Sequence, residues 1–227
     1  MPKKNVRDMI GYGFKGAKVA WPNNARIAVQ IVLNYEEGAE NCLLNGDKNS
    51  EIFLSEIIGA QPIKGRHINM ESLYEYGSRA GFWRLHKLFQ EKKIPITIFG
   101  VGMALEKNPE ICKAIKKAGY EVASHGWRWI DYQNIKKSEE KKHMQLAIKA
   151  HKKIFGKRPN GWYTGRCSPN TRDLVMEDGG FLYDSDSYSD DLPYWETRNK
   201  KKQLIIPYTL DNNDMRFATN QGFNTGD

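Results

Sequence analysis

The sequence predicts a single α/β domain with a parallel, barrel-like sheet. Two observations lead to this prediction: short apolar runs rich in β-branched residues recur along the 227 residues, and amphipathic helical segments separate them. Strands that alternate with helices form right-handed βαβ units, which build a parallel sheet. No internal repeat or low-complexity linker interrupts the alternation. We therefore expect one domain over residues 1–227, with an irregular N-terminal segment, 1–24, packing on it.

The first half of the chain is expected to contain strands 27–33, 96–101 and 121–124 and helices 84–93 and 109–118. The strands are apolar runs, and the helices place apolar residues at i, i+3 and i+4. Pro95 ends the first helix, whereas Pro109 opens the second and Gly119 closes it. A long polar connection, residues 38–65, separates the first strand from the first helix.

The second half is expected to contain helices 138–155 and 171–177 and strands 161–164, 181–184 and 204–206. Glu139 and Glu140 favour the start of the longer helix, and Gly156 and Pro159 favour its end. These segments bring the number of expected strands to about six. Residues 222–227 resemble a loop, with no closing helix, so we expect a barrel that is incomplete at its C-terminal end.

Composition excludes several classes of protein. No stretch approaches the roughly 20 apolar residues that cross a bilayer, and residues 1–13 lack the apolar core of a secretory signal. Cys42, Cys112 and Cys167 form no CxxC pair, which is typical of free thiols in a reducing compartment, so we expect a cytoplasmic protein. The net charge of +8 comes mostly from lysines on helical faces, so we expect no nucleic-acid partner.

Glu36 and Glu37 directly follow the first expected strand, and Gly38 comes next. Catalytic groups collect at the carboxyl ends of parallel strands. Neighbouring side chains of an extended chain point to opposite faces, so one carboxylate can face the barrel mouth while the other supports it. The pattern predicts a general base, and either glutamate could be that base.

His125 follows the strand 121–124 and is the second candidate for acid–base chemistry. A metal site would need further ligands at suitable spacing, but the residue four positions on is Trp129, which cannot coordinate a metal. We expect His125 to hydrogen-bond substrate or base without a metal. A divalent metal held by Glu36, Glu37 and His125 is the less favoured alternative.

Three further charged residues lie at expected strand ends. Arg166 precedes the helix 171–177 and suits the anchoring of a polar or anionic group. Asp184 and Asp211 follow the next strands, and Asp184 is placed to orient a catalytic partner. The alternatives are a structural ion pair for Arg166 and turn formation for the aspartates.

Together, these segments resemble the polysaccharide deacetylase (NodB-homology) superfamily. Its metal-dependent members carry Thr-Phe-Asp-Asp-Gly and His-Ser/Thr-x-x-His, where this chain has Asn34-Tyr35-Glu36-Glu37-Gly38 and His125-Gly126-Trp127-Arg128-Trp129. Both Asp-to-Glu changes and the missing second histidine depart from the metal site. The departures, with segments 8–13, 70–81, 162–171 and 207–217, are similar to the bacterial metal-independent allantoinases of that superfamily.

The resemblance implies a distorted (β/α)7 barrel and a hydrolase of carbon–nitrogen bonds that opens allantoin to allantoate without a cofactor. It implies that Glu36 or Glu37 activates water and that His125 and Trp129 line the pocket. Arg166 would bind a ureide carbonyl, with support from Asp184 and Asp211. The further wall residues implied by the resemblance are Tyr35, Trp162 and Tyr163. The family's general acid is a histidine in a later strand, and this chain has none after His151, so we expect activity to be impaired.

The sequence fits two alternative functions. The chain could be a metal-dependent deacetylase of N-acetylated glycans, which Trp129 and the lack of an export signal disfavour. It could also be an inactive relative or fragment of such an enzyme. On the favoured interpretation, the partners are a small-molecule ureide and further copies of the chain, with neither nucleic acid nor membrane.

Overall fold

A computed structural model describes residues 7–218, which fall into two compact units. The first unit runs from Met1 to Gln30; its described part, residues 7–30, contains two 3-10 turns, Gly13–Lys15 and Pro22–Asn24, and no buried side chain. The second unit runs from Ile31 to Asp227 and holds the described strands and α-helices. No helix among residues 7–218 is both long and apolar enough to span a membrane.

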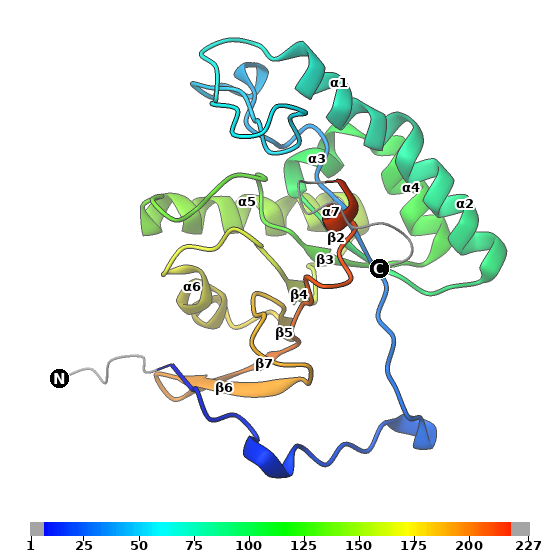
Figure 1. The fold of residues 1–227 in the computed structure, drawn as a ribbon, viewed down its shortest axis with the longest axis vertical. Helices are drawn as coiled ribbons and strands as arrows, with labels where there is room; N and C mark the ends of the chain where they lie inside the picture. The colour runs from blue at the N-terminus through cyan, green and yellow to red at the C-terminus, as the bar shows by residue number, and fades with distance from the viewer. Residues whose placement is uncertain (1–6, 219–227) are drawn as a thin grey trace. The chain divides into compact units, whose positions relative to one another are not determined.

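The second unit is built on a seven-stranded sheet in the order β1-β2-β3-β4-β5-β7-β6 (Figure 1). The strands are β1 (Val32–Tyr35), β2 (Thr97–Gly100), β3 (Glu121–Ser124), β4 (Gly161–Trp162), β5 (Tyr183–Asp184), β6 (Tyr194–Arg198) and β7 (Lys201–Ile205). All neighbours pair in parallel except β6 and β7, which form an antiparallel hairpin. The predicted α/β fold with a mostly parallel sheet is therefore confirmed.

Helices connect the strands. They are α1 (Ile68–Tyr76), α2 (Phe82–Lys92), α3 (Gly102–Lys107), α4 (Pro109–Ala118), α5 (Lys137–Phe155), α6 (Thr171–Asp178) and α7 (Met215–Ala218), with a π-helical turn, Gly77–Gly81, joining α1 to α2. The ends of α4 follow the predicted signals: the helix begins at Pro109, and Gly119 follows its end in a left-handed conformation with φ 69°. Asn108, which was not predicted, caps the start by accepting a hydrogen bond from the Ile111 amide.

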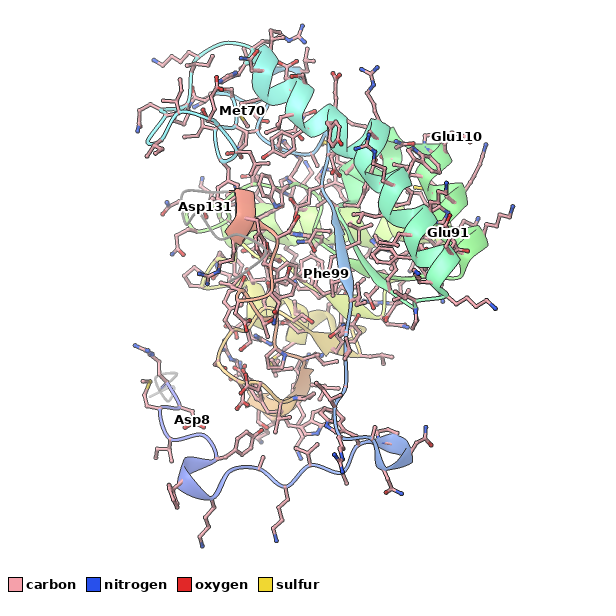
Figure 2. The ribbon with its side chains drawn as sticks, turned by 45° about the vertical axis from the view of Figure 1, so that its right-hand side comes forward. Asp8, Met70, Glu91, Phe99, Glu110 and Asp131 are labelled. Atoms are coloured by element: carbon pink, nitrogen blue, oxygen red, sulfur yellow. The ribbon has the colours of Figure 1, made fainter. Side chains whose placement is uncertain are left out.

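The two faces of the sheet have different neighbours. On one face, Ile96 and Ile98 pack against helical residues such as Ile111 and Ile115 in a shared buried cluster. On the other, Phe99, Ala123, Tyr163 and Tyr183 form a cluster that contains no residue from the helices, and Phe99 lies near the centre of the view in Figure 2. The alternation of side chains along each strand produces this division.

The first predicted strand was misplaced. Residues 27–33 were expected to be extended and buried, but β1 begins at Val32, and Ile27 and Val29 are mostly exposed. The register pairs Val32 with Thr97, the first residue of β2. The structure also contains β6, α1 and α3, which the sequence pattern did not predict.

Candidate active site

Glu36 directly follows β1 and His125 directly follows β3, so both lie at the carboxyl end of the parallel sheet. Strand pairing continues beyond β3, because the His125 amide donates to the Gly100 carbonyl at 2.9 Å. The two side chains meet: Glu36 Oε1 lies 3.1 Å from His125 Nε2. His125 is 2 % exposed and Glu36 18 %, so the carboxylate is the more accessible member of the pair.

A cluster of aromatic rings adjoins His125 on the helix-free face of the sheet. The ring centroid of Tyr163 is 4.9 Å from that of His125, and Tyr163 also packs against Phe99 and stacks on Tyr208, each at 4.9 Å. Burial raises the pKa of Tyr163 and Tyr208, so both hydroxyls stay protonated at neutral pH. Tyr208 was not among the predicted site residues, although its place after the last parallel strand was a usable signal.

Glu37 turns to the opposite side of the chain. Its Oε2 accepts the Glu36 amide at 3.0 Å, and its carboxylate lies against Gly77, where an added Cβ would be 2.0 Å from Oε1. Burial raises the pKa of Glu37 to about 7, and the negative charge of Glu36 adds to the shift. Glu37 therefore lies against the π-helical turn, outside the Glu36–His125 pair.

Tyr35 lies on the same side as Glu37. Its ring packs edge-on against Phe82 at 5.9 Å, and its hydroxyl is 2.9 Å from Ser78 Oγ. Tyr35 and Glu37 help to line a cleft of about 270 Å³ that also reaches Lys107. This placement sets Tyr35 among the helices, and its contact with substrate stays a prediction.

Trp129 and Arg166 come together as a stacked pair. The guanidinium carbon of Arg166 lies 3.8 Å from the centroid of the Trp129 ring and 5.0 Å from that of Phe53. The Trp129 amide donates to the Ala39 carbonyl at 3.0 Å, which ties this segment to the loop after β1. Cation–π contact on two rings holds the guanidinium in a fixed plane.

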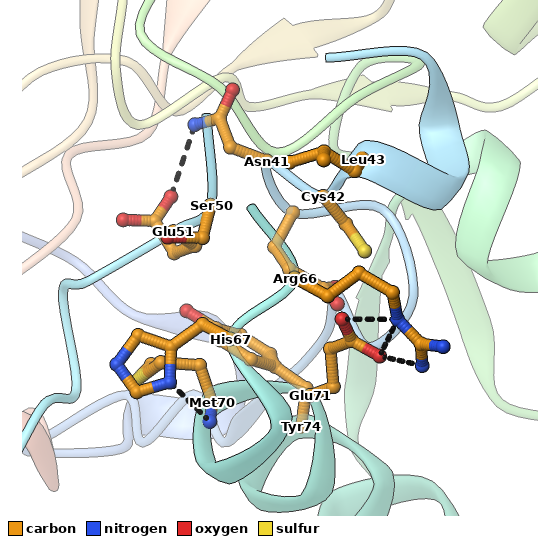
Figure 3. Close-up of a pocket in the computed structure, with 11 residues that line it drawn as sticks. Asn41, Cys42, Leu43, Ser50, Glu51, Arg66, His67, Met70, Glu71 and Tyr74 are labelled. Carbon is orange, nitrogen blue, oxygen red and sulfur yellow. Dashed lines mark hydrogen bonds and ion pairs between the residues drawn. The ribbon is translucent and has the colours of Figure 1, made fainter. Parts of the chain in front are cut away.

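Glu51 completes the binding of Arg166. Its Oε2 lies 3.4 Å from Arg166 Nη1. The same oxygen accepts a hydrogen bond from Asn41 Nδ2 at 3.1 Å, which Figure 3 shows. Glu51 is buried, and it also accepts the amides of Ile52 and Phe53. Neither Glu51 nor Phe53 was predicted, because the 38–65 connection has no periodic pattern that would reveal a buried acid.

Asp184 and Asp211 lie in different surroundings. Asp184 is fully buried, and its Oδ2 forms an ion pair with Arg172 Nη1 of α6 at 3.0 Å. Burial raises the pKa of Asp184, and the neighbouring Asp186 adds to the shift while Arg172 opposes it. Asp211 is exposed. A direct contact of either aspartate with substrate stays a prediction.

Asp186 supports the segment that carries Arg166. Its carboxylate accepts the amides of Thr164 at 2.8 Å and Gly165 at 2.8 Å, while its own amide donates to Asp184 Oδ1 at 2.8 Å. Asp184 is thus linked to the segment before Arg166 indirectly: Asp184 binds the Asp186 amide, and the Asp186 carboxylate binds the amides of Thr164 and Gly165.

The donor set does not fit a metal centre of the kind that the Asp-Asp and His-x-x-x-His motifs would build. Glu36 and His125 supply two donors, Glu37 faces the π-helical turn, and the Trp129 indole cannot coordinate. Across residues 7–218, no three His, Cys, Asp or Glu side chains are grouped so that they could hold an ion. Chemistry without a metal ion stays a prediction.

The sheet carries a Glu–His pair at its carboxyl edge, a pairing that acid–base chemistry can use. Comparison with known proteins gives the family. The polysaccharide deacetylase family pattern matches residues 69–178. A Schizosaccharomyces pombe protein provisionally named polysaccharide deacetylase is 42 % identical over 98 % of this chain and 75 % of its own length. The chain belongs to the polysaccharide deacetylase (NodB) family of hydrolases.

Solved structures agree with this assignment. A crystal structure described as that of a probable polysaccharide deacetylase from Pseudomonas aeruginosa is 59 % identical, with a TM-score of 0.92 over 97 % of this chain and 74 % of that one. The structure of PuuE allantoinase is 58 % identical, with the same TM-score and coverage. A Mycobacterium smegmatis structure described as a polysaccharide deacetylase superposes with a TM-score of 0.71 at 26 % identity, over 93 % of this chain and 69 % of that one.

Proposed function

We propose that this protein is an allantoinase-like hydrolase that opens a cyclic ureide, allantoin to allantoate, without a metal ion. The observation that carries the proposal is the Glu36–His125 pair, 3.1 Å apart, in a site where Trp129 stands four residues after His125. The 58 % identity to PuuE allantoinase over 97 % of the chain supports the same substrate class.

In the proposed mechanism, Glu36 is the general base. It takes a proton from a water molecule while the water oxygen bonds to an amide carbonyl carbon of the ring. The carbon–nitrogen bond then breaks, and the ring nitrogen takes up the proton that Glu36 received. In this proposal the His125 imidazole, whose Nε2 lies 3.1 Å from Glu36 Oε1, keeps the carboxylate aimed at the water.

The surroundings of the pair suit a small, uncharged, polar ring. Tyr163, Tyr208 and Trp129 bring flat apolar faces, which exclude water and so strengthen each hydrogen bond made inside. Arg166 is stacked on Trp129 and paired with Glu51, and in this proposal its guanidinium donates to a carbonyl oxygen of the ring.

The test is ring opening of allantoin by the purified 227-residue chain in excess EDTA. We expect turnover that EDTA does not reduce. Glu36→Gln should lower kcat by about 10²- to 10⁴-fold, the usual contribution of a positioned base. Glu37→Gln is the matched control, because the same change one residue further on lies against Gly77 and should leave kcat within about threefold.

The contrary result is equally clear. Zinc-dependent release of acetate from an N-acetylglucosamine oligomer, with no opening of allantoin, would replace this proposal by glycan deacetylation, the activity after which the family is named. An equal loss of kcat in both glutamine variants would remove Glu36 from its role as base.

A further inference from the structure

Tyr74 on α1 has a buried hydroxyl that lacks a partner. The residue is 6 % exposed, and its Oη makes no hydrogen bond with any residue in the described range 7–218. Other buried tyrosine hydroxyls are bonded: that of Tyr132 lies 2.9 Å from His143 Nδ1, and that of Tyr183 donates to Glu121 at 3.1 Å. Leaving a buried polar group unpaired costs about 1–3 kcal/mol, so its retention needs a reason.

The Tyr74 ring packs beside the stacked pair of Trp129 and Arg166. Its centroid lies 5.7 Å from that of Trp129, the ring that carries Arg166. Figure 3 shows Tyr74 on the helix near the loop that bears Glu51. Tyr74 and Glu51 both line the pocket drawn in Figure 3, and Tyr74 does so from a helix that the sequence motifs of the site do not include.

The charges around Tyr74 keep its hydroxyl a donor. Burial is the largest cause that raises the pKa of Tyr74, and the negative charges of Glu51 and Glu36 add to it. The effect of Arg166 is in the opposite direction and smaller. A protonated phenol can donate a hydrogen bond to an acceptor that enters with the substrate.

We propose that Tyr74 determines specificity by donating a hydrogen bond to a carbonyl oxygen of the bound ring. This inference rests on the proposed ureide hydrolysis and names a recognition element for it. The bound substrate accepts a hydrogen bond from the Tyr74 hydroxyl, which has no partner in the free protein. A ring that lacks the matching carbonyl leaves the hydroxyl unpaired, so the cost of burying it without a hydrogen bond remains.

The test compares Tyr74→Phe with the wild type in kcat/KM for allantoin and in the inhibition constants of three rings. Hydantoin carries two ring carbonyls, and imidazolidin-2-one and imidazolidin-4-one keep one each. We expect Tyr74→Phe to weaken hydantoin and one of the single-carbonyl rings by about 5- to 100-fold and to leave the other unchanged. Allantoin kcat/KM should fall by a similar factor.

Stability provides a second readout that separates recognition from a structural role. Because Tyr74→Phe removes an unpaired polar group and keeps the ring, its unfolding midpoint should be unchanged or raised. Tyr183→Phe is the matched control: it breaks the bond to Glu121 at the opposite end of β3, so its midpoint should fall while its inhibition constants stay unchanged.

Two results overturn the inference. Equal inhibition constants for wild type and Tyr74→Phe on all three rings would remove Tyr74 from recognition, even while allantoin turnover upheld the proposed function. Failure of the wild type to open allantoin and to bind any of the rings would overturn the proposed function, and the role of Tyr74 with it.

Discussion

The two carboxylates that follow β1 are neighbours in sequence but lie in different surroundings. Glu36 reaches His125 at 3.1 Å on the face that Tyr163 lines, whereas Glu37 lies against Gly77 of the π-helical turn. The pKa of Glu37 is raised to about 7, chiefly by burial. Identical side chains thus receive different chemistry because an extended chain alternates its faces, and the residue type alone does not distinguish them.

The largest expected effect is on the Glu36 side. His125→Asn should lower kcat for allantoin by about 10²-fold, because the shorter side chain loses the contact that aims the Glu36 carboxylate. Steady-state kinetics at saturating allantoin measure it. His143→Asn is the control, since His143 pairs with Tyr132 instead; an equal loss in both variants would contradict a specific role for His125.

The second prediction concerns how Glu37 affects the free energy of unfolding. The Glu37 carboxyl ionises near 4.5 in the unfolded chain and near 7 in the folded protein. Between these values the folded state binds more protons, so its free energy of unfolding falls as pH rises from 4.5 to 7. Glu37→Gln abolishes this titration and should raise the free energy of unfolding at pH 8 by on the order of 3 kcal/mol.

Urea unfolding of both proteins at pH 4.5, 6 and 8 measures this difference. The advantage of Glu37→Gln should be smallest at pH 4.5 and grow toward pH 8. A constant difference across the three pH values, or an advantage that shrinks as pH rises, would show that Glu37 does not titrate as a buried acid.

The smallest effect comes from the contact between Glu37 and the π-helical turn. A Cβ at Gly77 would lie 2.0 Å from Glu37 Oε1, so Gly77→Ala must displace that carboxylate. We expect a loss of about 1–2 kcal/mol in the free energy of unfolding in the wild type. In a Glu37→Ala background the same change should stabilise by up to about 1 kcal/mol, because alanine favours a helix.

The double-mutant cycle in urea measures the coupling between the two positions. A value near zero would show that Glu37 and Gly77 do not constrain each other, and the comparison between the two carboxylates would lose its structural basis on this side.

The sequence predicted the fold where local signals and tertiary structure agree. Strand 121–124 was predicted with its observed bounds, and Pro109 and Gly119 mark the ends of α4. The pattern missed the helical run before residue 84, because Gly77, Ser78 and Gly81 are poor helix formers. In the structure α1, the π-helical turn and α2 follow one another without a break, and Gly77 leaves room there for Glu37.

The candidate site also contains a part that could be predicted from the sequence and a part that could not. The meeting of Glu36 and His125 could be predicted because the carboxyl ends of parallel strands lie at one edge. Glu51, Phe53 and Tyr74 could not, because they reach Arg166 or Trp129 from a loop without periodicity and from an unpredicted helix. Their places depend on tertiary contacts that no short segment of sequence encodes.

The Glu-Glu pair also bears on how this junction tolerates insertions and deletions. Side chains alternate with a period of two, so loss of one residue from β1 would bring Glu37 to the place of Glu36. The same slip would bring Tyr35, now 1 % exposed among helices, to the opposite face. Positions 36 and 37 carry the same side chain, so the slip leaves a glutamate at position 36, whereas Asn34 and Tyr35 differ and the slip changes which of them faces the helices. An alignment could match Glu-Glu in two relatives while the strand before it has shifted by one residue.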